Sequence, residues 1–594
     1  MSRSLLEMGR SHNCGVLRKD DVGEQTTLMG WVHNRRDHGG AIFIDLRDRY
    51  GVTQIVFRQD ANEEAHRLAS ELRSEFCIAV HGQVECRGEN VNPKLPTGTI
   101  EVIVDDLEIF SQSETPPFLI EDEIDTGESV RLQYRYLDLR RPSVQKNFLT
   151  RSAVSNRVRS FLSEEGYIEL ETPFLIKNTP GGARNFLVPS RMSSHDFYAL
   201  AESPQLYKQL FMVAGFDRYF QIVRCFRDED LRGDRQPEFT QVDIELSFAK
   251  EDTLYEMMER MMAAIFKDVL DFDLPTPFPR LTYKEAIARY GSDKPDLRFD
   301  LPLTEITDLV GGCGFRIFEG AVESGAIVKA LRVPQAAKAL SRKVLDSLPE
   351  LVKPVGAKGV AYARIQEGGT WQAPFAKAMT AESMVAINER VGAEVGDVVL
   401  FLADQANIAN NALTLLRRDM ADRFDLIDKK SWSPVWITEF PLLEKSEETN
   451  QWVACHHPFT FPHPEDIELL NTDRQGEIRA RAYDMVLNGV EVGGGSIRIH
   501  QEELQNQVFR AIGIDEEEAQ SKFSFLLEAF RYGPPPHGGI ALGLDRLIML
   551  LCGTDSLRDV IAFPKTQRGT CALTGAPSAV TQAQLDELHV QLKR

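Results

Sequence analysis

The chain has 594 residues, of which 43% are hydrophobic and 26% are charged, and its formal net charge is -21. This length exceeds what one hydrophobic core usually holds, so we expect about three or four domains. The acidic balance argues against a basic protein that coats nucleic acid without specificity, but it leaves room for a local basic patch on an acidic body.

The eight cysteines are scattered and include no Cys-x-x-Cys pair. We therefore expect reduced thiols, not a disulfide framework or a zinc site. Residues 1–15 contain no apolar core of signal-peptide length, and no apolar run is long enough to span a bilayer. These observations predict a cytoplasmic protein with no membrane partner.

Residues 1–112 predict a small β-barrel. Runs with strand periodicity occur at 27–33, 41–47, 52–57, 78–86 and 99–110, and a helical stretch at 63–73 interrupts them. Five strands with one helix fit an OB-type barrel, a fold that binds single-stranded nucleic acid. Candidate contacts to phosphates and bases lie along its edge: Arg35, Arg36, His38, Phe43 and Gln54.

A polar, proline-containing hinge follows at 113–145. Helical spacing then begins near Phe148 and continues to Gly166, where a short apolar segment leads to Pro173. We take 146–297 as the first part of a catalytic domain. Within it a second helix is predicted to open at Ser203, with Ser203-Pro204 as the N-cap and first helical residue.

Residues 219–249 predict two antiparallel strands joined by a long polar connection. Apolar side chains such as Phe220 and Ile244 share one face, which should be buried. The other face carries an aromatic ring among arginines and carboxylates, including Arg227 and Phe239. An ordinary solvated sheet face also looks polar, but this combination suits a planar base, a phosphate and an ammonium group.

A methionine-rich helix at 254–270 has the spacing of core packing. The sequence pattern then changes over 298–429, where no cluster of residues can be assigned a chemical role. Because motif-like stretches of sequence resume at 430, we predict that 298–429 is an inserted α+β domain. Residues 430–570 would then complete the catalytic domain. Residues 571–594 are left as a C-terminal extension.

In 430–570, Asn488-Gly489 predicts a two-residue hairpin turn that brings Asp484 and Glu491 together on one face. Two apposed carboxylates suit Mg²⁺, although an exposed acidic hairpin has the same pattern. Arg498 follows as a candidate clamp for a carboxylate. Arg546 falls in the first turn of the next predicted helix, where a bound anion would explain a cation.

Three stretches resemble the class II aminoacyl-tRNA synthetases, in the family's order. Residues 166–175 look like motif 1, 226–229 with 237–241 look like motif 2, and 538–551 look like motif 3. The longer sequence of 226–243 resembles the aspartyl-tRNA synthetases of bacterial type. This resemblance covers nearly the whole chain. It implies a multidomain α/β protein with an N-terminal OB-fold anticodon-binding domain, an antiparallel-sheet catalytic domain and the inserted domain.

The resemblance also implies a reaction and its residues. Aspartate and ATP would form aspartyl-adenylate with Mg²⁺, and the aspartyl group would pass to tRNA(Asp) on a homodimer formed through 166–175. The implied catalytic residues are Arg227, Glu491 and Arg546, and the metal would be held by Asp484 and Glu491. Implied ATP contacts are Arg227, Asp228, Glu229, Gln236, Phe239, Glu491, Gly543, Leu544, Asp545 and Arg546. Implied aspartate contacts are Gly181, Ser203, Gln205, Lys208, Arg227, Asp243, His456, His457 and Arg498.

The chain departs from this family in the loop that closes over aspartate. Gly181 and Asn185 stand where the family usually has Glu and Asp, so we expect a weaker hold on the amino group. His38-Gly39-Gly40 is similar to members that also charge tRNA(Asn), and we predict this second substrate.

The alternatives are a strictly discriminating aspartyl enzyme, an asparaginyl or lysyl enzyme, and a non-catalytic RNA-binding relative. Lys208 and Arg498, as two cations against one short carboxylate, favour aspartate over the other two amino acids. Intact Arg227, Glu491 and Arg546 argue against the non-catalytic relative.

Overall fold

The computed structural model describes residues 4–179, 184–229, 234–446 and 449–593. The chain divides into two compact units. One unit comprises Met1–Arg151 and Arg558–Ser578, and the other comprises Ser152–Leu557 and Ala579–Arg594.

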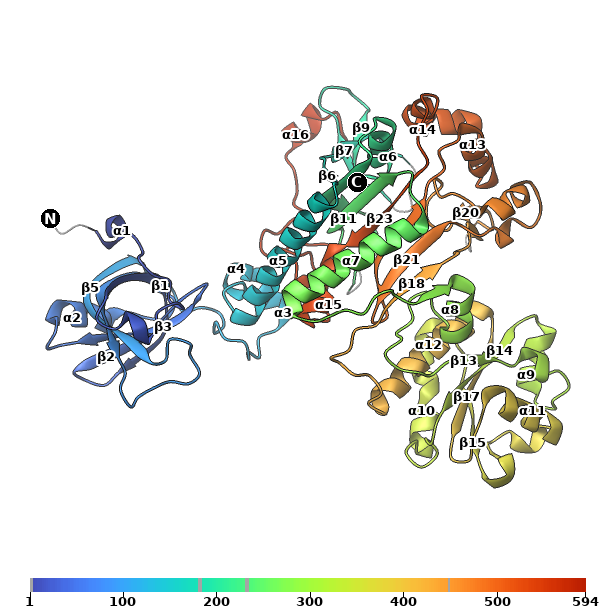
Figure 1. The fold of residues 1–594 in the computed structure, drawn as a ribbon, viewed down its shortest axis with the longest axis horizontal. Coiled ribbons are helices and arrows are strands. Elements are labelled where there is room, and N and C mark those ends of the chain that lie inside the picture. The colour runs from blue at the N-terminus through green and yellow to red at the C-terminus, as the bar shows by residue number, and fades with distance from the viewer. Residues whose placement is uncertain (1–3, 180–183, 230–233, 447–448, 594) are drawn as a thin grey trace. The chain divides into compact units, whose positions relative to one another are not determined.

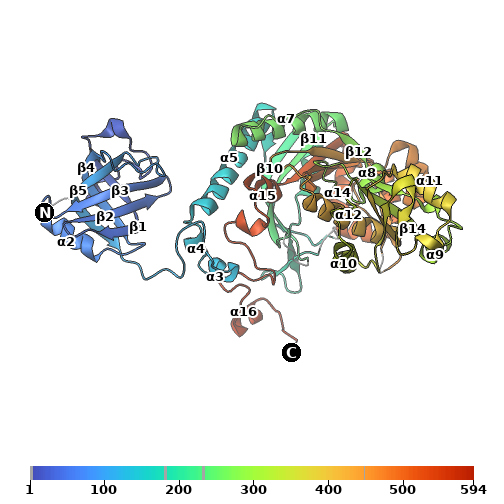
Figure 2. The same cartoon turned by 90° about the horizontal axis from the view of Figure 1, so that it is seen from below.

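The first unit contains a closed five-stranded barrel in the order β1-β2-β3-β5-β4 (Figure 2). Its strands are β1 (Gln25–Asp37), β2 (Ala41–Asp48), β3 (Gly51–Arg58), β4 (Cys77–Cys86) and β5 (Ile100–Ser111), and helix α2 spans Glu63–Glu71. The inward side chains of every strand, among them Leu28, Ile44 and Val80, form one buried cluster with Ala65 and Ala69 of α2. The barrel and helix predicted from the sequence are therefore confirmed.

After the barrel, the chain forms two short helices, α3 (Glu128–Gln133) and α4 (Arg135–Asp138). Asp138 is fully buried and pairs with Arg135 at 2.5 Å and with Arg141 at 2.8 Å. Arg135 also donates to the carbonyl oxygens of Arg558 and Ile561. A buried charge costs stability unless it is paired and hydrogen-bonded. This cluster therefore links the segment that contains Arg558 and Ile561 to the hinge.

The second unit is built on an eight-stranded sheet in the order β12-β18-β21-β22-β23-β11-β10-β6. Its strands are β6 (Ile168–Glu169), β10 (Arg218–Phe226), β11 (Glu238–Ser247), β12 (Arg280–Thr282), β18 (Pro434–Thr438), β21 (Ala482–Leu487), β22 (Val490–Ile497) and β23 (His537–Gly543). All neighbours are antiparallel except β10 with β6 and β12 with β18. Helices α5 (Pro142–Glu164) and α7 (Glu251–Leu270) lie side by side (Figure 1), joined by an Arg157–Asp268 ion pair at 3.0 Å.

Smaller elements surround this sheet. The strands β7 (Leu175–Ile176), β8 (Leu187–Pro189) and β9 (Phe197–Leu200) form a small sheet of their own, and β19 (Leu443–Lys445) pairs with β20 (Trp452–Ala454). The remaining helices are α6 (Gln205–Val213), α8 (Tyr283–Tyr290), α13 (Glu502–Ala511), α14 (Glu516–Phe530), α15 (Leu544–Cys552) and α16 (Gln582–Glu587).

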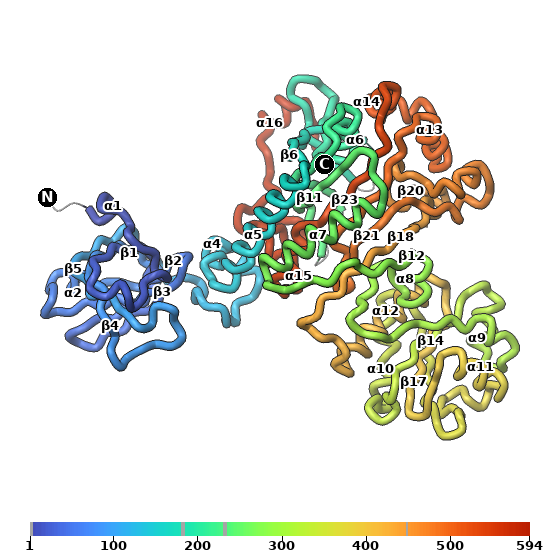
Figure 3. Tube along the Cα trace, in the orientation of Figure 1, coloured from blue at the N-terminus to red at the C-terminus, as the bar shows by residue number. Residues whose placement is uncertain are grey.

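Between α8 and β18 the chain builds a separate five-stranded sheet in the order β13-β14-β17-β15-β16, as the tube in Figure 3 follows. Its strands are β13 (Leu303–Glu305), β14 (Ile327–Val333), β15 (Ala361–Ile365), β16 (Trp371–Gln372) and β17 (Val398–Asp404). Its helices are α9 (Arg316–Glu323), α10 (Arg342–Val352), α11 (Ala381–Val391) and α12 (Ala406–Arg423). Two separate clusters of buried side chains pack against this sheet, which is the α+β arrangement predicted for 298–429.

Three local features differ from the sequence-based expectations. Helix α6 begins at Gln205 with Pro204 at the N-cap position and no side-chain cap, so Ser203 does not cap it. The motif 1 strand is only two residues long. A bulge between Met485 and Val486 shifts the register of β21 with β22. None of the eight cysteines forms a disulfide, and no helix in the described ranges is long and apolar enough to cross a membrane.

Candidate active site

A cavity of about 550 Å³ opens where β11, β21, β22 and β23 meet α6 and the start of α15. It gathers most of the predicted site residues: Ser203, Gln205, Lys208, Arg227, Glu229, Gln236, Phe239, Asp243, His456, His457, Asp484, Glu491, Arg498, Gly543, Asp545 and Arg546. Asp228 and Leu544 do not line it, and Leu544 is buried in the core. Gly181 lies outside the described residues.

Arg227 lies just past the end of β10, beside the aromatic residue that the hairpin register brings to the same face. Its guanidinium carbon is 5.0 Å from the centre of the Phe239 ring. Its Nε is buried and has no hydrogen-bond partner within the described part of the chain. The ring therefore holds the guanidinium by a cation–π contact and leaves donors for an anion.

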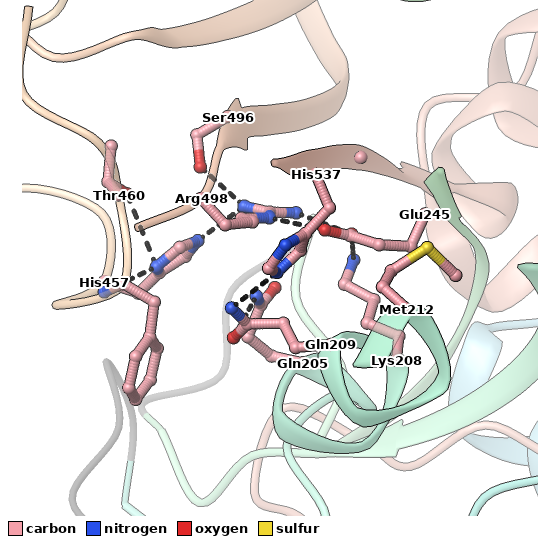
Figure 4. A network of polar contacts seen from close by, with 12 residues as sticks. Gln205, Lys208, Gln209, Met212, Glu245, His457, Thr460, Ser496, Arg498 and His537 are labelled. Carbon is pink, nitrogen blue, oxygen red and sulfur yellow. Dashed lines mark hydrogen bonds and ion pairs between the residues drawn. The ribbon is translucent and has the colours of Figure 1, made fainter. Parts of the chain in front are cut away.

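A buried ionic network includes three residues of the cavity lining, Lys208, Asp243 and Arg498. Figure 4 shows how Glu245 lies between Lys208 and Arg498 in this network. Lys208 lies 2.8 Å from Asp243 Oδ1 and 3.2 Å from Glu245 Oε2. Glu245 accepts from Arg498 as well, at 3.0 Å from Nε and 3.2 Å from Nη2. Glu245 is fully buried and bridges the two cations, so it fixes the direction of the Arg498 fork.

This network corrects the electrostatic argument for aspartate. Lys208 and Arg498 are not an excess of positive charge, because Asp243 and Glu245 balance them. Burial raises the pKa of Asp243 to about 6, against the lowering effect of Lys208. The Asp243 Oδ2 atom is buried and has no hydrogen-bond partner in the described ranges, so it can accept from a ligand such as an ammonium group.

The charges of Glu245 and His457 follow from the same contacts. Burial alone would raise the pKa of Glu245, but Arg498 and Lys208 together hold it below its usual range. Burial and then Arg498 lower the pKa of His457 well below its ordinary value. The neutral ring accepts from Arg498 Nη1 through Nε2, at 2.7 Å, and Ser496 Oγ accepts from the same nitrogen at 2.6 Å.

Asp484 and Glu491 both face the cavity, as the hairpin turn predicted. Because of the bulge, Asp484 pairs with Gly494, and a Cβ at position 494 would lie 2.5 Å from Asp484 Oδ1. A side chain at position 494 would therefore displace this carboxylate. Two converging carboxylates fit the hard oxygen ligands of Mg²⁺. The described residues offer no cluster of three or more His, Cys, Asp or Glu ligands, so a cation here would need oxygens from a ligand or water.

Two cations meet the Glu491 carboxylate. Lys294 Nζ lies 2.9 Å and Arg546 Nη1 3.7 Å from Glu491 Oε2. Although burial alone would raise it, the pKa of Glu491 lies below its usual range because of Lys294 and Arg546. Burial raises the pKa of Asp484. Burial of the His456 ring alone would lower its pKa, but the Asp484 carboxylate raises the pKa of His456 to about 10.

Arg546 occupies the first turn of α15, as predicted, and donates from Nη1 to the Glu491 carbonyl oxygen at 3.1 Å. Its neighbour Asp545 is buried and accepts from the backbone N–H of Thr240 at 2.7 Å. Asp545 therefore joins α15 to β11, while Arg546 presents a cation to the cavity.

The predicted nucleic-acid contacts on the barrel divide between two faces. Arg36 pairs with Phe43 across β1 and β2, and the His38 ring meets Phe43 edge-on with centroids 5.6 Å apart. Arg36 donates to Gln54 Oε1, but Gln54 is buried and its amide donates to Glu101. Arg35 pairs with a core position of β2 and reaches the Ala69 carbonyl oxygen of α2, so it lies on the other face.

Two residues of the site, Glu245 behind the cavity lining and Lys294 in it, were missed from the sequence. Glu245 belongs to the polar face of the hairpin, and its alternation with apolar residues was visible, but its place between Lys208 and Arg498 depends on distant parts of the chain. Lys294 lies in an irregular segment after α8, without a periodic pattern to mark it.

Comparison with known proteins assigns the fold. Residues 127–567 match the model of "tRNA synthetases class II (D, K and N)", and residues 26–110 match that of the "OB-fold nucleic acid binding domain". An asparaginyl-tRNA synthetase from Pyrococcus horikoshii, solved with asparaginyl-adenylate, has a TM-score of 0.60 at 18% identity and covers 93% of this chain and 98% of its own. An aspartyl tRNA synthetase from Entamoeba histolytica has a TM-score of 0.57 at 19% identity, covering 95% and 93%.

Curated relatives are much more similar in sequence. A protein named aspartate–tRNA(Asp/Asn) ligase from Anaeromyxobacter dehalogenans is 54% identical over 599 aligned residues, covering 100% of this chain and 99% of the relative. One of the same name from Desulfatibacillum aliphaticivorans is also 54% identical, with the same coverage. With its fold, its cavity and these full-length relatives, the chain belongs to the class II tRNA synthetases of the D, K and N group.

Proposed function

We propose that this protein attaches L-aspartate to tRNA in two ATP-dependent steps. In the first, an oxygen of the aspartate α-carboxylate attacks the α-phosphorus of ATP, and pyrophosphate leaves. In the second, the terminal ribose hydroxyl of tRNA attacks the aspartyl carbonyl carbon, and AMP leaves. The name shared by the relatives that are 54% identical over the full chain supports this substrate class.

The cavity supplies the groups that the first step needs. The attacking carboxylate is already ionised at pH 7, since the pKa of an α-carboxyl group lies far below 7, so no protein base is required. Arg227 bridges the reacting carboxylate and the α-phosphate, Phe239 stacks the adenine, and Glu229 and Gln236 lie beside it. Arg546 meets the terminal phosphates. Catalysis is then positioning and stabilisation of charge.

The buried network selects the amino acid. Arg498 and Lys208 meet the side-chain carboxylate of aspartate, and the open Asp243 Oδ2 accepts from its ammonium group, with Ser203 and Gln205 nearby. Asparagine carries an amide NH2, which is a donor, where aspartate has an accepting oxygen, so it would leave a donor of this buried set without an acceptor, which is costly.

Asp484 and Glu491 would hold Mg²⁺ with oxygens of ATP. Bound there, the cation would supply neutralisation of phosphate charge. The two carboxylates converge beside Gly494, where a side chain would displace Asp484, and this supports the assignment.

The observation that carries the proposal is the fixed Arg498 fork over a buried Lys208, held by Glu245. Its test is the charging of purified tRNA(Asp) with labelled aspartate, asparagine or lysine. We expect aspartyl-tRNA alone. Charging with asparagine or lysine at a comparable rate would contradict the assignment. Because charging takes place where tRNA is used in translation, we propose the cytoplasm as the site of action.

We further propose that tRNA(Asn) is a second substrate. The exposed His38 ring stands against Phe43, where it can donate to or stack on either base at the third anticodon position, the only one that differs. The expected ratio of kcat/KM for tRNA(Asp) over tRNA(Asn) is within about tenfold, and His38→Leu should raise it.

Charging the two purified tRNAs side by side measures this ratio, with His66→Leu on α2 as the control. A preference of the unaltered protein above about a thousandfold, or about 4 kcal/mol, would mean strict discrimination and end this proposal.

We also propose a homodimer through 166–175. Apolar side chains of this element and the strand after it are exposed, with Ile168 at 46%, Phe174 at 44% and Leu175 at 50%. Exposed apolar side chains close together in one element favour association, and a two-fold interface would cover them with the same element of a second copy.

Light scattering at micromolar concentration should give twice the chain mass of 67.0 kDa, and Leu175→Lys should lower it. A mass near that of one chain for the unaltered protein would contradict the dimer.

A further inference from the structure

Lys294 is a cavity residue that belongs to none of the three motifs. It lies in the segment that leads from α8 into the inserted domain, and its side chain is 40% exposed. Its Nζ meets the same Glu491 oxygen as Arg546, at 2.9 Å against 3.7 Å. Two cations from distant parts of the chain therefore stand next to each other at the carboxylate proposed to hold a metal ion.

The arrangement gives Lys294 more than the role of a surface ion pair. An ammonium group has three donors, and only the contact with Glu491 engages them among the described residues. A divalent cation bound by Glu491 and Asp484 would compete with Lys294 for the same oxygen, since like charges repel. An ammonium group released from Glu491 would be free to pair with phosphate oxygens bound in the same part of the cavity. Lysine binds phosphate as a point charge.

The backbone that carries Lys294 is fixed on the catalytic side. Helix α8 ends at Tyr290, and its C-cap Gly291 adopts a left-handed conformation with φ of 71°. The N–H of Lys294 donates to Ser292 Oγ at 3.0 Å. Two residues later, Asp296 packs against Gly489 in the turn between β21 and β22. A Cβ at position 489 would lie 3.0 Å from the Cβ of Asp296. The segment that carries Lys294 therefore contacts the hairpin of β21 and β22 that carries Asp484 and Glu491.

The inserted domain fixes the other end of the segment. Arg417 of α12 is buried and donates to three backbone carbonyl oxygens of this segment, those of Asp296 at 2.8 Å, Phe299 at 3.0 Å and Leu301 at 3.0 Å. Its guanidinium also lies 4.0 Å from the centre of the Phe299 ring. Leu301 and Phe299 join the apolar cluster of the inserted domain. One arginine of the inserted domain thus holds the chain two residues from Lys294.

We propose that Lys294 is a further ligand for the terminal phosphates of ATP and for the pyrophosphate product, and that the inserted domain positions it through Arg417. This inference rests on the proposed function, since it adds a residue to the same site. It assigns the inserted domain a part in nucleotide binding, and Arg417 is then a positioning residue.

The first test is calorimetric binding of inorganic pyrophosphate and of ATP, each with Mg²⁺ and without amino acid or tRNA. Lys294→Met should weaken both by about tenfold or more, the scale of one charge-assisted contact. Lys284→Met, at an exposed position of α8, is the control and should change neither. In steady-state exchange, Lys294→Met should raise the KM for ATP and leave the KM for aspartate unchanged.

Unchanged affinity of Lys294→Met for pyrophosphate would overturn the proposal, as would an equal loss of aspartate and ATP binding, which indicates a structural role. A chain that activates no amino acid, yet loses pyrophosphate affinity on this substitution, would refute the proposed function and leave the role of Lys294 standing.

The second test separates Arg417 from general stability. Arg417→Lys keeps the charge but cannot reach three carbonyl oxygens. We expect weaker pyrophosphate binding than in the unaltered chain, and no further loss when Lys294→Met is added, because the two changes act through one contact. Losses that add fully would overturn the positioning role. A melting curve for each variant identifies unfolding, and Phe299→Leu provides a second, milder disturbance of the same segment.

Discussion

Arg227→Lys is expected to abolish aspartate-dependent ATP–pyrophosphate exchange, with a loss in kcat/KM of at least about a thousandfold. The planar fork of arginine can bridge a carboxylate and a phosphate, whereas an ammonium group cannot hold both in that geometry. The substitution also removes the contact with the Phe239 ring, which holds the guanidinium at 5.0 Å.

The matched control is Arg224→Lys, on the same strand but with a side chain that is 40% exposed and outside the cavity. It should keep nearly full activity. If Arg227→Lys exchanges pyrophosphate at the rate of the unaltered chain, the role assigned to Arg227 is wrong.

Glu245→Gln is expected to reduce the free energy of unfolding by about 3–5 kcal/mol, because it leaves two buried cations with one carboxylate. It also removes the pairing that orients the Arg498 fork, so the KM for aspartate should rise by about tenfold or more. Urea unfolding and steady-state exchange measure the two effects. Glu238→Gln, on the same strand with a side chain 32% exposed, is the control.

The effect on stability should depend on pH. The folded-state pKa of Glu245 lies below its ordinary value of about 4.3, so its contribution is present above that pH. The contribution is lost as the pH falls through the folded-state pKa, and the difference between Glu245→Gln and the unaltered chain should shrink there. An equal unfolding free energy for both proteins at pH 7 would refute the bridging role of Glu245.

Local sequence patterns predicted the parts of the fold that local physics determines. Period-two alternation located the barrel strands and the β10–β11 hairpin, and Asn488-Gly489 located the turn of β21 and β22. The bulge after Met485 escaped prediction, because it depends on how β22 also pairs with β23. The start of α6 was placed too early, since a Ser-Pro pair permits an N-cap without requiring one.

The candidate site was predicted where a motif or a turn marks it, and missed where only tertiary contacts do. Arg227, Phe239 and Arg546 follow from strand and helix positions. The burial of Glu245 between two cations depends on Arg498, which is 253 residues away. Lys294 reaches the cavity from an irregular segment. Arg35 does not lie on the face of Arg36, because the strand register directs its side chain toward α2.

The central claim is that this cavity activates aspartate, and ATP–pyrophosphate exchange without tRNA tests it most directly. The purified chain is incubated with ATP, Mg²⁺, labelled pyrophosphate and each amino acid in turn. We predict label in ATP with aspartate and, with asparagine, a rate lower by at least about a hundredfold, since the amide NH2 of asparagine would leave a donor of the buried network without an acceptor. Exchange with asparagine or lysine that equals or exceeds exchange with aspartate would contradict the account.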